Sequence, residues 1–161
     1  MQTNSHGIPL ISVDLAFTDE ATAQLYSNDH APATELSCGT DLRACIESAE
    51  VTVAPGGRVP VRTGVRIQPQ QPGWAGFVYS RSGLGARDGL TVAQGVGVID
   101  PDYTGEITVF LLNTSGTPRR IKRGERIAQL IFLPFAQPLF TRVADLSSTQ
   151  RGAGGFGHTG R

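Results

Sequence analysis

The stretch IAQLIFL, from Ile127 to Leu133, is nearly all apolar and follows the turn-like pair Gly124-Glu125. A short apolar run that is bounded by turn residues is typical of a strand buried on both faces. We therefore expect residues 127–133 to form a central strand, with the rest of the chain arranged around it.

The segments on either side of this run are also short, and they are separated by Gly and Pro, which together number 30 in 161 residues. The segment 106–113, EITVFLLN, begins with alternating polar and apolar residues, and 10–15, LISVDL, alternates in the same way. Further expected strands cover residues 51–54, 58–62, 64–67, 76–79 and 138–143. Regularly spaced short strands predict an all-β domain, either a sandwich or a barrel. Helices should be short, with one start at Asp19 or after Arg81.

The composition indicates one globular domain without a general affinity for anions. Hydrophobic residues make up 39% of the chain, charged residues 17%, and the formal net charge is zero. A neutral chain is not suited to general attraction to nucleic acid, so any anion site must be local. Polar residues follow Met1 and no apolar run reaches the roughly 18 residues that a membrane span needs, so we expect neither a secretory signal nor a span. Both cysteines, Cys38 and Cys45, are expected to be reduced, half-buried thiols of a cytoplasmic protein.

The segment SRSGLG, Ser80 to Gly85, has the residue types of an anion site. If Ser82 starts a helical turn, the free backbone N–H groups and the local dipole favour an anion. Arg81 adds a planar, bidentate partner for phosphate. The alternative is a helix N-cap beside a surface arginine.

The segment GVIDPDYTGE, Gly97 to Glu106, has a carboxylate at the end of an apolar run. Asp100 in that position is suited to act as a general base toward water, and Tyr103 to pack flat on a sugar. The alternative is an ordinary β-turn, in which Asp100 makes an Asx-type contact and Tyr103 caps a hairpin.

Two further polar residues leave alternatives open. Gln129, in the segment RGERIAQL from Arg123 to Leu130, is an amide inside the apolar run. A buried amide needs partners, so its side chain either pairs with backbone or reaches a ligand. Asp41, in CGTDLRA, either forms a structural ion pair with Arg43 or faces a ligand or the water around a metal.

The C-terminal segment RGAGGFGHTGR, Arg151 to Arg161, is too rich in Gly to build a helix, a strand or a core of its own. One aromatic ring with flanking cations suits a nucleotide base and its phosphates. The alternative is a disordered terminus.

In their order and spacing, these five segments resemble the five motifs of the trimeric dUTP diphosphatases (dUTPases). The resemblance runs from about Cys38 to Gly160 and includes PGWAG, Pro72 to Gly76, ahead of the second motif. It implies a jelly-roll-like β fold, a homotrimer, and active sites that draw motifs from more than one subunit. The implied reaction hydrolyses dUTP to dUMP and pyrophosphate, which limits uracil incorporation into DNA and supplies dUMP for thymidylate synthesis. No nucleic-acid or membrane partner is implied.

The same resemblance assigns roles to the nucleoside-binding residues. Asp100 would deprotonate the water that attacks the α-phosphorus, and Tyr103 would pack under the deoxyribose and exclude a 2′-hydroxyl. A hairpin would read the edge of uracil, mainly through backbone groups, with Gln94, Gly97, Val98 and Ile99.

The resemblance also assigns the phosphate contacts, the metal and the tail. The phosphates would bind Arg81, Ser82, Gly83 and Gln129. Mg²⁺ would be held mainly by the triphosphate and water, with Asp41 supporting the hydrated metal indirectly. The expected division is a β domain, 1–147, and a flexible arm, 148–161, that closes over the site with Arg151, Phe156, Gly157, His158 and Thr159.

Two other functions are weaker fits to the residues. The related dCTP deaminases need a carboxylate about where Phe110 stands in this chain. A non-catalytic nucleotide sensor would not need the combination of Asp100, Tyr103, Ser82 and Gln129.

Overall fold

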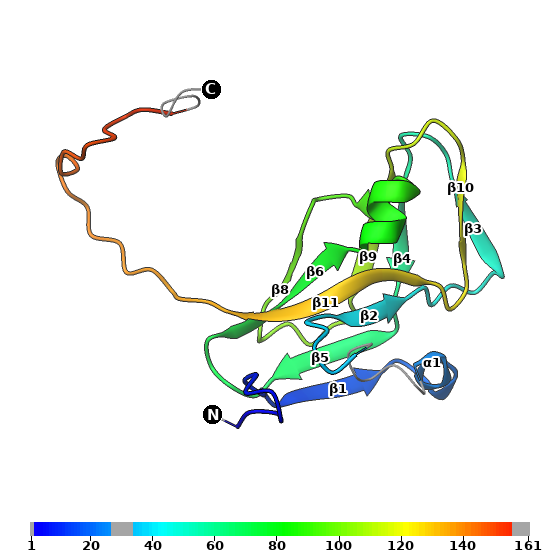
Figure 1. The fold of residues 1–161 in the computed structure, drawn as a ribbon. Coiled ribbons are helices and arrows are strands. Elements are labelled where there is room, and N and C mark those ends of the chain that lie inside the picture. Colours follow the sequence, from blue (N-terminus) through cyan, green and yellow to red (C-terminus); the bar gives the residue numbers. More distant parts are fainter. Residues whose placement is uncertain (1, 27–33, 156–161) are drawn as a thin grey trace.

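The computed structural model describes residues 2–26 and 34–155, and this part of the chain is an all-β domain with two short helices (Figure 1). The helices are α1 (Glu20–Leu25) and a single π-helical turn, η1 (Gly83–Arg87). The strands are β1 (Val13–Phe17), β2 (Thr40–Arg43), β3 (Glu50–Val53), β4 (Arg58–Arg62), β5 (Val65–Pro69), β6 (Trp74–Ser80), β7 (Leu90–Val92), β8 (Gly97–Ile99), β9 (Thr108–Asn113), β10 (Arg119–Lys122) and β11 (Arg126–Pro134).

The expected central strand is confirmed. β11 lies between β2 and β6, and β8 forms one edge of this four-stranded antiparallel sheet. The register places Gln129 opposite Asp41 on β2 and opposite Tyr79 on β6, and Ala128 opposite Ser80. The sheet therefore brings three of the sequence segments singled out above to one place, because β2 follows Gly39, β6 ends at Ser80 and β11 holds Gln129.

The remaining strands form a three-stranded sheet, β4-β9-β7, and two pairs, β1-β5 and β10-β3. Aliphatic side chains from these elements and from β2 and β11 form one core, and its least exposed large members are Leu42, Leu90, Ile107, Leu111, Ile121 and Ile127. Burial of this apolar surface is the main favourable term in folding.

Some strand boundaries differ from the expected ones. β1 starts at Val13 rather than Leu10, and it pairs with β5 as far as Phe17. β9 starts at Thr108 rather than Glu106, because its pairing with β4 begins with Thr108 opposite Arg62, and the Ile107 backbone bonds instead to the Thr63 N–H and the Val65 carbonyl. Periodicity locates a strand, but contacts of this kind decide where its pairing begins.

Both candidate helix starts are used. Asp19 is the N-cap of α1, and its carboxylate accepts the Thr22 N–H at 2.7 Å; this hydrogen bond lowers the pKa of Asp19. Ser82 precedes η1, but its side chain makes no capping hydrogen bond.

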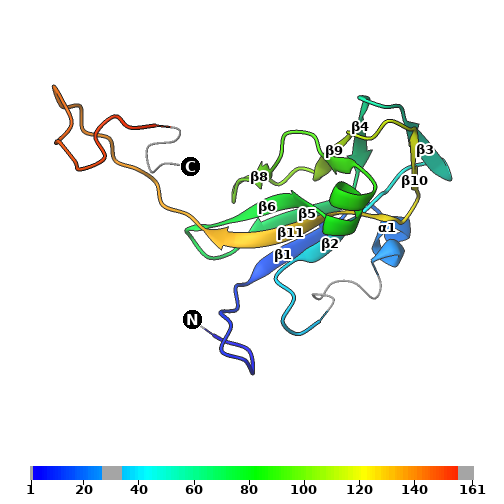
Figure 2. The same cartoon turned by 45° about the horizontal axis from the view of Figure 1, so that its top comes forward.

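The strand expected over 138–143 is wrong. Residues 135–155 lead away from the strands as extended chain in both views (Figures 1 and 2), and no strand forms there in the described residues. Leu139 is 96% exposed and Phe140 88%. The segment has the residues of a strand, but a strand also needs a partner, and this chain offers none within its described part.

The expected boundary at residue 147 falls inside the extended segment, since β11 ends at Pro134. Of the two cysteines, both free, Cys45 is partly buried as expected and Cys38 is exposed. No helix in the described ranges is long and apolar enough to cross a membrane.

Candidate active site

A cationic cavity lies where β2, the end of β6 and β11 meet. It has a volume of about 590 Å³. Its lining includes Asp41, Arg81, Ser82, Gly83, Arg126 and Gln129, with Cys38 and Arg87 at the same cavity. The strand register explains this grouping, since β11 pairs with both β2 and β6. The structure therefore brings together the four residues expected to bind phosphates.

Asp41 holds two arginines of this cavity. One carboxylate oxygen accepts from Arg81 Nε at 2.8 Å, and the other accepts from Arg126 Nη1 at 3.1 Å. Arg43 instead donates from Nη1 to the Gly124 carbonyl. The structural pair with Arg43 is therefore wrong, since β2 pairing with β11 brings Arg126 to Asp41. Charge-assisted contacts of this kind orient the guanidinium groups.

Arg126 was missed as a site residue. It stands in RGERIAQL, where the sequence motif assigns a role to Gln129 alone. No local signal marks Arg126, because it reaches Asp41 only through the pairing of β11 with β2.

Gln129 pairs with backbone and also reaches the cavity. Its Nε2 donates to the Ser80 carbonyl at 3.1 Å. Its Oε1 packs beside Gly39, where an added Cβ would lie only 3.0 Å away. The side chain is thus fixed by β6 on one side, while it lines the cavity with Arg81 and Ser82.

A second cavity, of about 260 Å³, lies beside β8. It is lined by all six of the residues expected to handle the nucleoside and the water, Gln94, Gly97, Val98, Ile99, Asp100 and Tyr103. The β-turn expected at Asp100 forms through backbone, because the Tyr103 N–H donates to the Asp100 carbonyl at 3.0 Å. Asp100 is exposed, and its carboxylate makes no hydrogen bond to any described residue.

β8 presents a free edge at this cavity. Its one strand neighbour among the described residues is β6. Backbone N–H and C=O groups on the other side of β8 are thus available to a ligand, since an edge strand leaves a row of such groups unpaired.

The two cavities have no lining residue in common. A single chain therefore does not bring Asp100 and Tyr103 into the same cavity as Arg81 and Ser82. Arg151 lies in the extended segment, where its Nε donates to the Gly154 carbonyl at 2.9 Å. The tail residues Phe156, Gly157, His158 and Thr159 lie outside the described residues.

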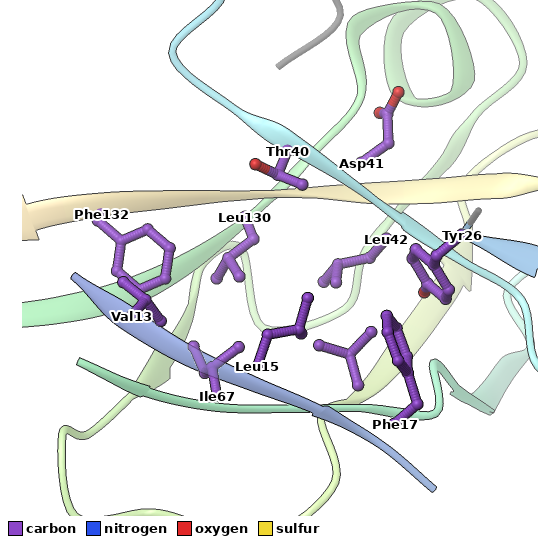
Figure 3. A pocket seen from close by; sticks show the side chains of 11 residues that line it. Val13, Leu15, Phe17, Tyr26, Thr40, Asp41, Leu42, Ile67, Leu130 and Phe132 are labelled. Carbon is purple, nitrogen blue, oxygen red and sulfur yellow. The ribbon is translucent and has the colours of Figure 1, made fainter. Parts of the chain in front are cut away.

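A third cavity, not expected from the sequence, opens between β1 and β2 and has a volume of about 150 Å³. Figure 3 shows Leu15, Phe17, Leu42 and Leu130 around it, while the Asp41 carboxylate points away from it. Tyr26 closes one end, where its hydroxyl donates to the Thr63 carbonyl at 3.0 Å. Burial raises the pKa of Tyr26 well above its ordinary value. The lining is almost entirely apolar, so this cavity suits apolar side chains.

Carboxylates do not gather into a metal site in the described ranges. Within residues 2–26 and 34–155, no group of three His, Cys, Asp or Glu side chains could hold a metal ion. Asp41, the residue expected to support the metal, has both oxygens engaged by arginines.

A family model and curated relatives both identify this chain as similar to dUTPases. The dUTPase family model matches residues 26–160. Deoxyuridine 5′-triphosphate nucleotidohydrolase of Actinobacillus pleuropneumoniae serotype 5b (strain L20) is 48% identical over 131 residues, which cover 81% of this chain and 86% of the relative.

Solved structures show the same fold. The dUTPase of Staphylococcus bacteriophage 80alpha, solved with dUPNHPP, has a TM-score of 0.77 at 22% identity and covers 93% of this chain and 99% of its own. A mutant dUTPase from phage phi11 of S. aureus, described for the coordination of a structural Mg(II) ion, has a TM-score of 0.69 at 19% identity, over 85% of this chain and 99% of its own.

Proposed function

Because the chain belongs to the dUTPase family and hydrolyses dUTP to dUMP and pyrophosphate, we propose that its two polar cavities are the two halves of the active site. The observation that supports this most directly is that the expected nucleoside-binding and phosphate-binding residues line different cavities. One cavity holds Asp100 and Tyr103 beside the free edge of β8, and the other holds Arg81, Ser82 and Gln129.

The cavity beside β8 would bind the nucleoside. Uracil would be read by backbone groups on the free edge of Gly97 to Ile99, with Gln94 beside them. Gly97 is buried against Val78, and an added Cβ would lie 3.2 Å from the Val78 Cβ, so the backbone is held in place at this point. Tyr103, at the mouth of the same cavity, would pack under the deoxyribose.

The cationic cavity would bind the triphosphate. Arg81 and the Ser82 hydroxyl would neutralise charge that develops on the leaving pyrophosphate, and the Gly83 N–H and Gln129 would hold the phosphate oxygens. Positioning and charge neutralisation supply most of the catalysis in phosphoryl transfer. Asp41 would act here by holding Arg81 and Arg126 ready for the ligand, and its expected contact with a hydrated metal stays a prediction.

Mg²⁺ fits this chain as a companion of the substrate. The described carboxylates form no cage for it, which suits a hard cation that keeps several waters and binds through phosphate oxygens. When bound, the ion would neutralise charge on the triphosphate.

Asp100 would act as the general base. Its exposed carboxylate would take a proton from the water that attacks the α-phosphorus, while the bond from that phosphorus to the α–β bridging oxygen breaks and pyrophosphate leaves. The products are dUMP and pyrophosphate, and the proton is on Asp100 until solvent removes it.

The test replaces the Asp100 carboxylate with an amide of nearly the same shape that cannot accept the proton. Asp100→Asn should bind an imido analogue of dUTP nearly as well as the wild type, and its pyrophosphate release should fall by about 100-fold or more. Asp102→Asn is the matched control, since Asp102 is an exposed carboxylate in the same turn, and it should keep its turnover. Turnover of Asp100→Asn at the wild-type rate would exclude Asp100 as the base.

A jelly-roll-like homotrimer would join the two halves. Asp100 and Arg81 line different cavities in one chain, so a neighbouring subunit is needed to complete each site. The exposed apolar side chains of the extended segment, Leu139 and Phe140, would pack on such a neighbour. The apolar cavity between β1 and β2 is a complementary surface for them.

The roles of the tail and of the domain boundary stay predictions. Residues 148–161 would close over a site through Arg151, Phe156, Gly157, His158 and Thr159, and the extended segment before them gives the length to reach another subunit (Figure 1). A cytoplasmic location, expected from the sequence, also stays a prediction.

A further inference from the structure

The loop that joins Asp100 to β9 holds the Tyr103 ring through contacts with Gly105 and Glu106. The Tyr103 hydroxyl donates to the Glu106 carbonyl at 2.9 Å. The ring end also lies against the backbone of Gly105, where an added Cβ would be 2.6 Å from both Tyr103 Cζ and its hydroxyl oxygen. Real Cβ atoms do not approach so closely, so Gly105 is the residue that allows the ring to take this position.

Glu106 fixes the carbonyl that receives this hydroxyl. Its carboxylate accepts the Gly64 N–H at 2.7 Å with one oxygen, and Arg62 Nη2 at 2.7 Å with the other. The Glu106 side chain is 17% exposed. A mostly buried carboxylate that lost these partners would be destabilising, so Glu106 cannot move without breaking contacts to the β4–β5 connection.

The β4–β5 connection is itself braced by the segment around α1. The Thr18 N–H donates to the Gly64 carbonyl at 2.9 Å. Gly64 has a φ of +68°, and an added Cβ there would overlap the Thr22 methyl group. A further contact anchors the loop that holds Tyr103, since Arg66 Nε on β5 donates to the Thr104 carbonyl at 2.7 Å. The Tyr103 ring therefore rests on a support that extends through Glu106 and Gly64 to α1.

We propose that Gly105 and Glu106 are positioning residues that set the preference for deoxyribose over ribose by fixing the Tyr103 ring. The inference rests on the proposed role of Tyr103 under the sugar. The ring excludes a 2′-hydroxyl only if it cannot withdraw, and a shift of about 1 Å in a positioned group is enough to change turnover strongly. Gly105 lets the ring lie close to the backbone, and the Glu106 carbonyl holds its hydroxyl end.

The experiment measures kcat/KM of the full-length enzyme for dUTP and for UTP and compares their ratio. Gly105→Ala should lower the ratio at least tenfold, because the methyl group displaces the ring. The matched control is Gly116→Ala, where an added Cβ meets no described atom within 4 Å, and its ratio should equal that of the wild type. A Gly105→Ala enzyme that is folded and keeps the wild-type ratio would overturn the proposal.

Two further variants separate the possible failures. Tyr103→Phe keeps the ring and removes only the hydrogen bond to Glu106, so it should also lower the ratio, and it decides the question if thermal melting shows that Gly105→Ala is unfolded. Tyr103→Ala tests the premise. If Tyr103→Ala keeps the wild-type ratio, the proposed role of Tyr103 fails. If only Tyr103→Ala loses it, that role stands and the positioning inference is wrong.

The part of Glu106 is tested by a graded pair. Glu106→Ala removes the acceptor of the Gly64 N–H and the partner of Arg62, and it should lower the ratio as Gly105→Ala does. Glu106→Gln keeps an acceptor for Gly64 and should retain more of the ratio. Equal ratios in Glu106→Ala and wild type would remove Glu106 from the proposal.

Discussion

Gly76 on β6 is a position where a single methyl group should destabilise the fold. It is buried, and an added Cβ would lie 3.1 Å from Ile67 Cδ1, 3.1 Å from Leu130 Cδ1 and 3.2 Å from Ile99 Cβ. Carbon atoms in contact are usually about 3.5 to 4.0 Å apart. Gly76→Ala therefore places a methyl group too close to three strands at once.

Two effects of opposite sign decide the magnitude. Overpacking of a well-packed core costs about 1 to 3 kcal/mol. A Gly to Ala change also restricts the unfolded chain, which stabilises by about 0.4 to 1 kcal/mol. Because Ile67, Leu130 and Ile99 lie on three separate strands, shifting one side chain would not relieve all three close contacts. We therefore expect the cost of overpacking to exceed the gain from the restricted unfolded chain. We expect Gly76→Ala to lower the free energy of unfolding by about 1 to 2 kcal/mol.

Chemical denaturation with far-UV circular dichroism measures this change, at fixed protein concentration. Turnover of dUTP should fall as well, because Ile99 precedes Asp100 and pairs with Gly76. Gly116→Ala, in an open loop, is the control and should unfold at the same or slightly higher denaturant concentration. A Gly76→Ala protein as stable as Gly116→Ala would refute the packing argument.

Two further predictions concern the C-terminal part of the chain. Truncation after Gln150 should leave a folded trimer with much reduced dUTP turnover, measured by pyrophosphate release and light scattering; full activity would remove the tail from the site. The double change Leu139→Ser, Phe140→Ser should shift the measured mass from trimer toward monomer and lower turnover together with it, since in the proposed trimer each site needs two subunits. An unchanged trimer mass would show that this segment is not part of the interface.

Local sequence patterns predicted several strands around the core, among them β6, β9 and β11, but they missed β2, β7 and β10. The apolar run that became β11 and the N-cap at Asp19 depend on neighbours within a few residues, which periodicity and capping rules describe. The strand that was expected and does not form shows one limit of such patterns. Residues 138–143 have the composition of a strand, but a strand exists only with a partner, and composition says nothing about where the partner is.

The sequence motifs name the candidate site residues one by one, but they do not give the arrangement of those residues within a chain. The motifs single out Arg81, Ser82, Asp100 and Gln129, and within one chain the structure places Asp100 in one cavity and the other three residues in another. Nothing local in the sequence reports this division, because it arises from which strands pair.

By itself, the sequence determined the all-β class, the central position of β11 and the family to which the chain belongs, since these follow from short-range patterns and from ordered motifs. Which charged side chains meet depends on the folded arrangement of the strands. Asp41 binds Arg81 and Arg126, 40 and 85 residues away, and Glu106 binds Arg62, 44 residues away. The physical reason is that such pairs depend on strand order and register, and register is set by the packing of whole faces rather than by any one residue.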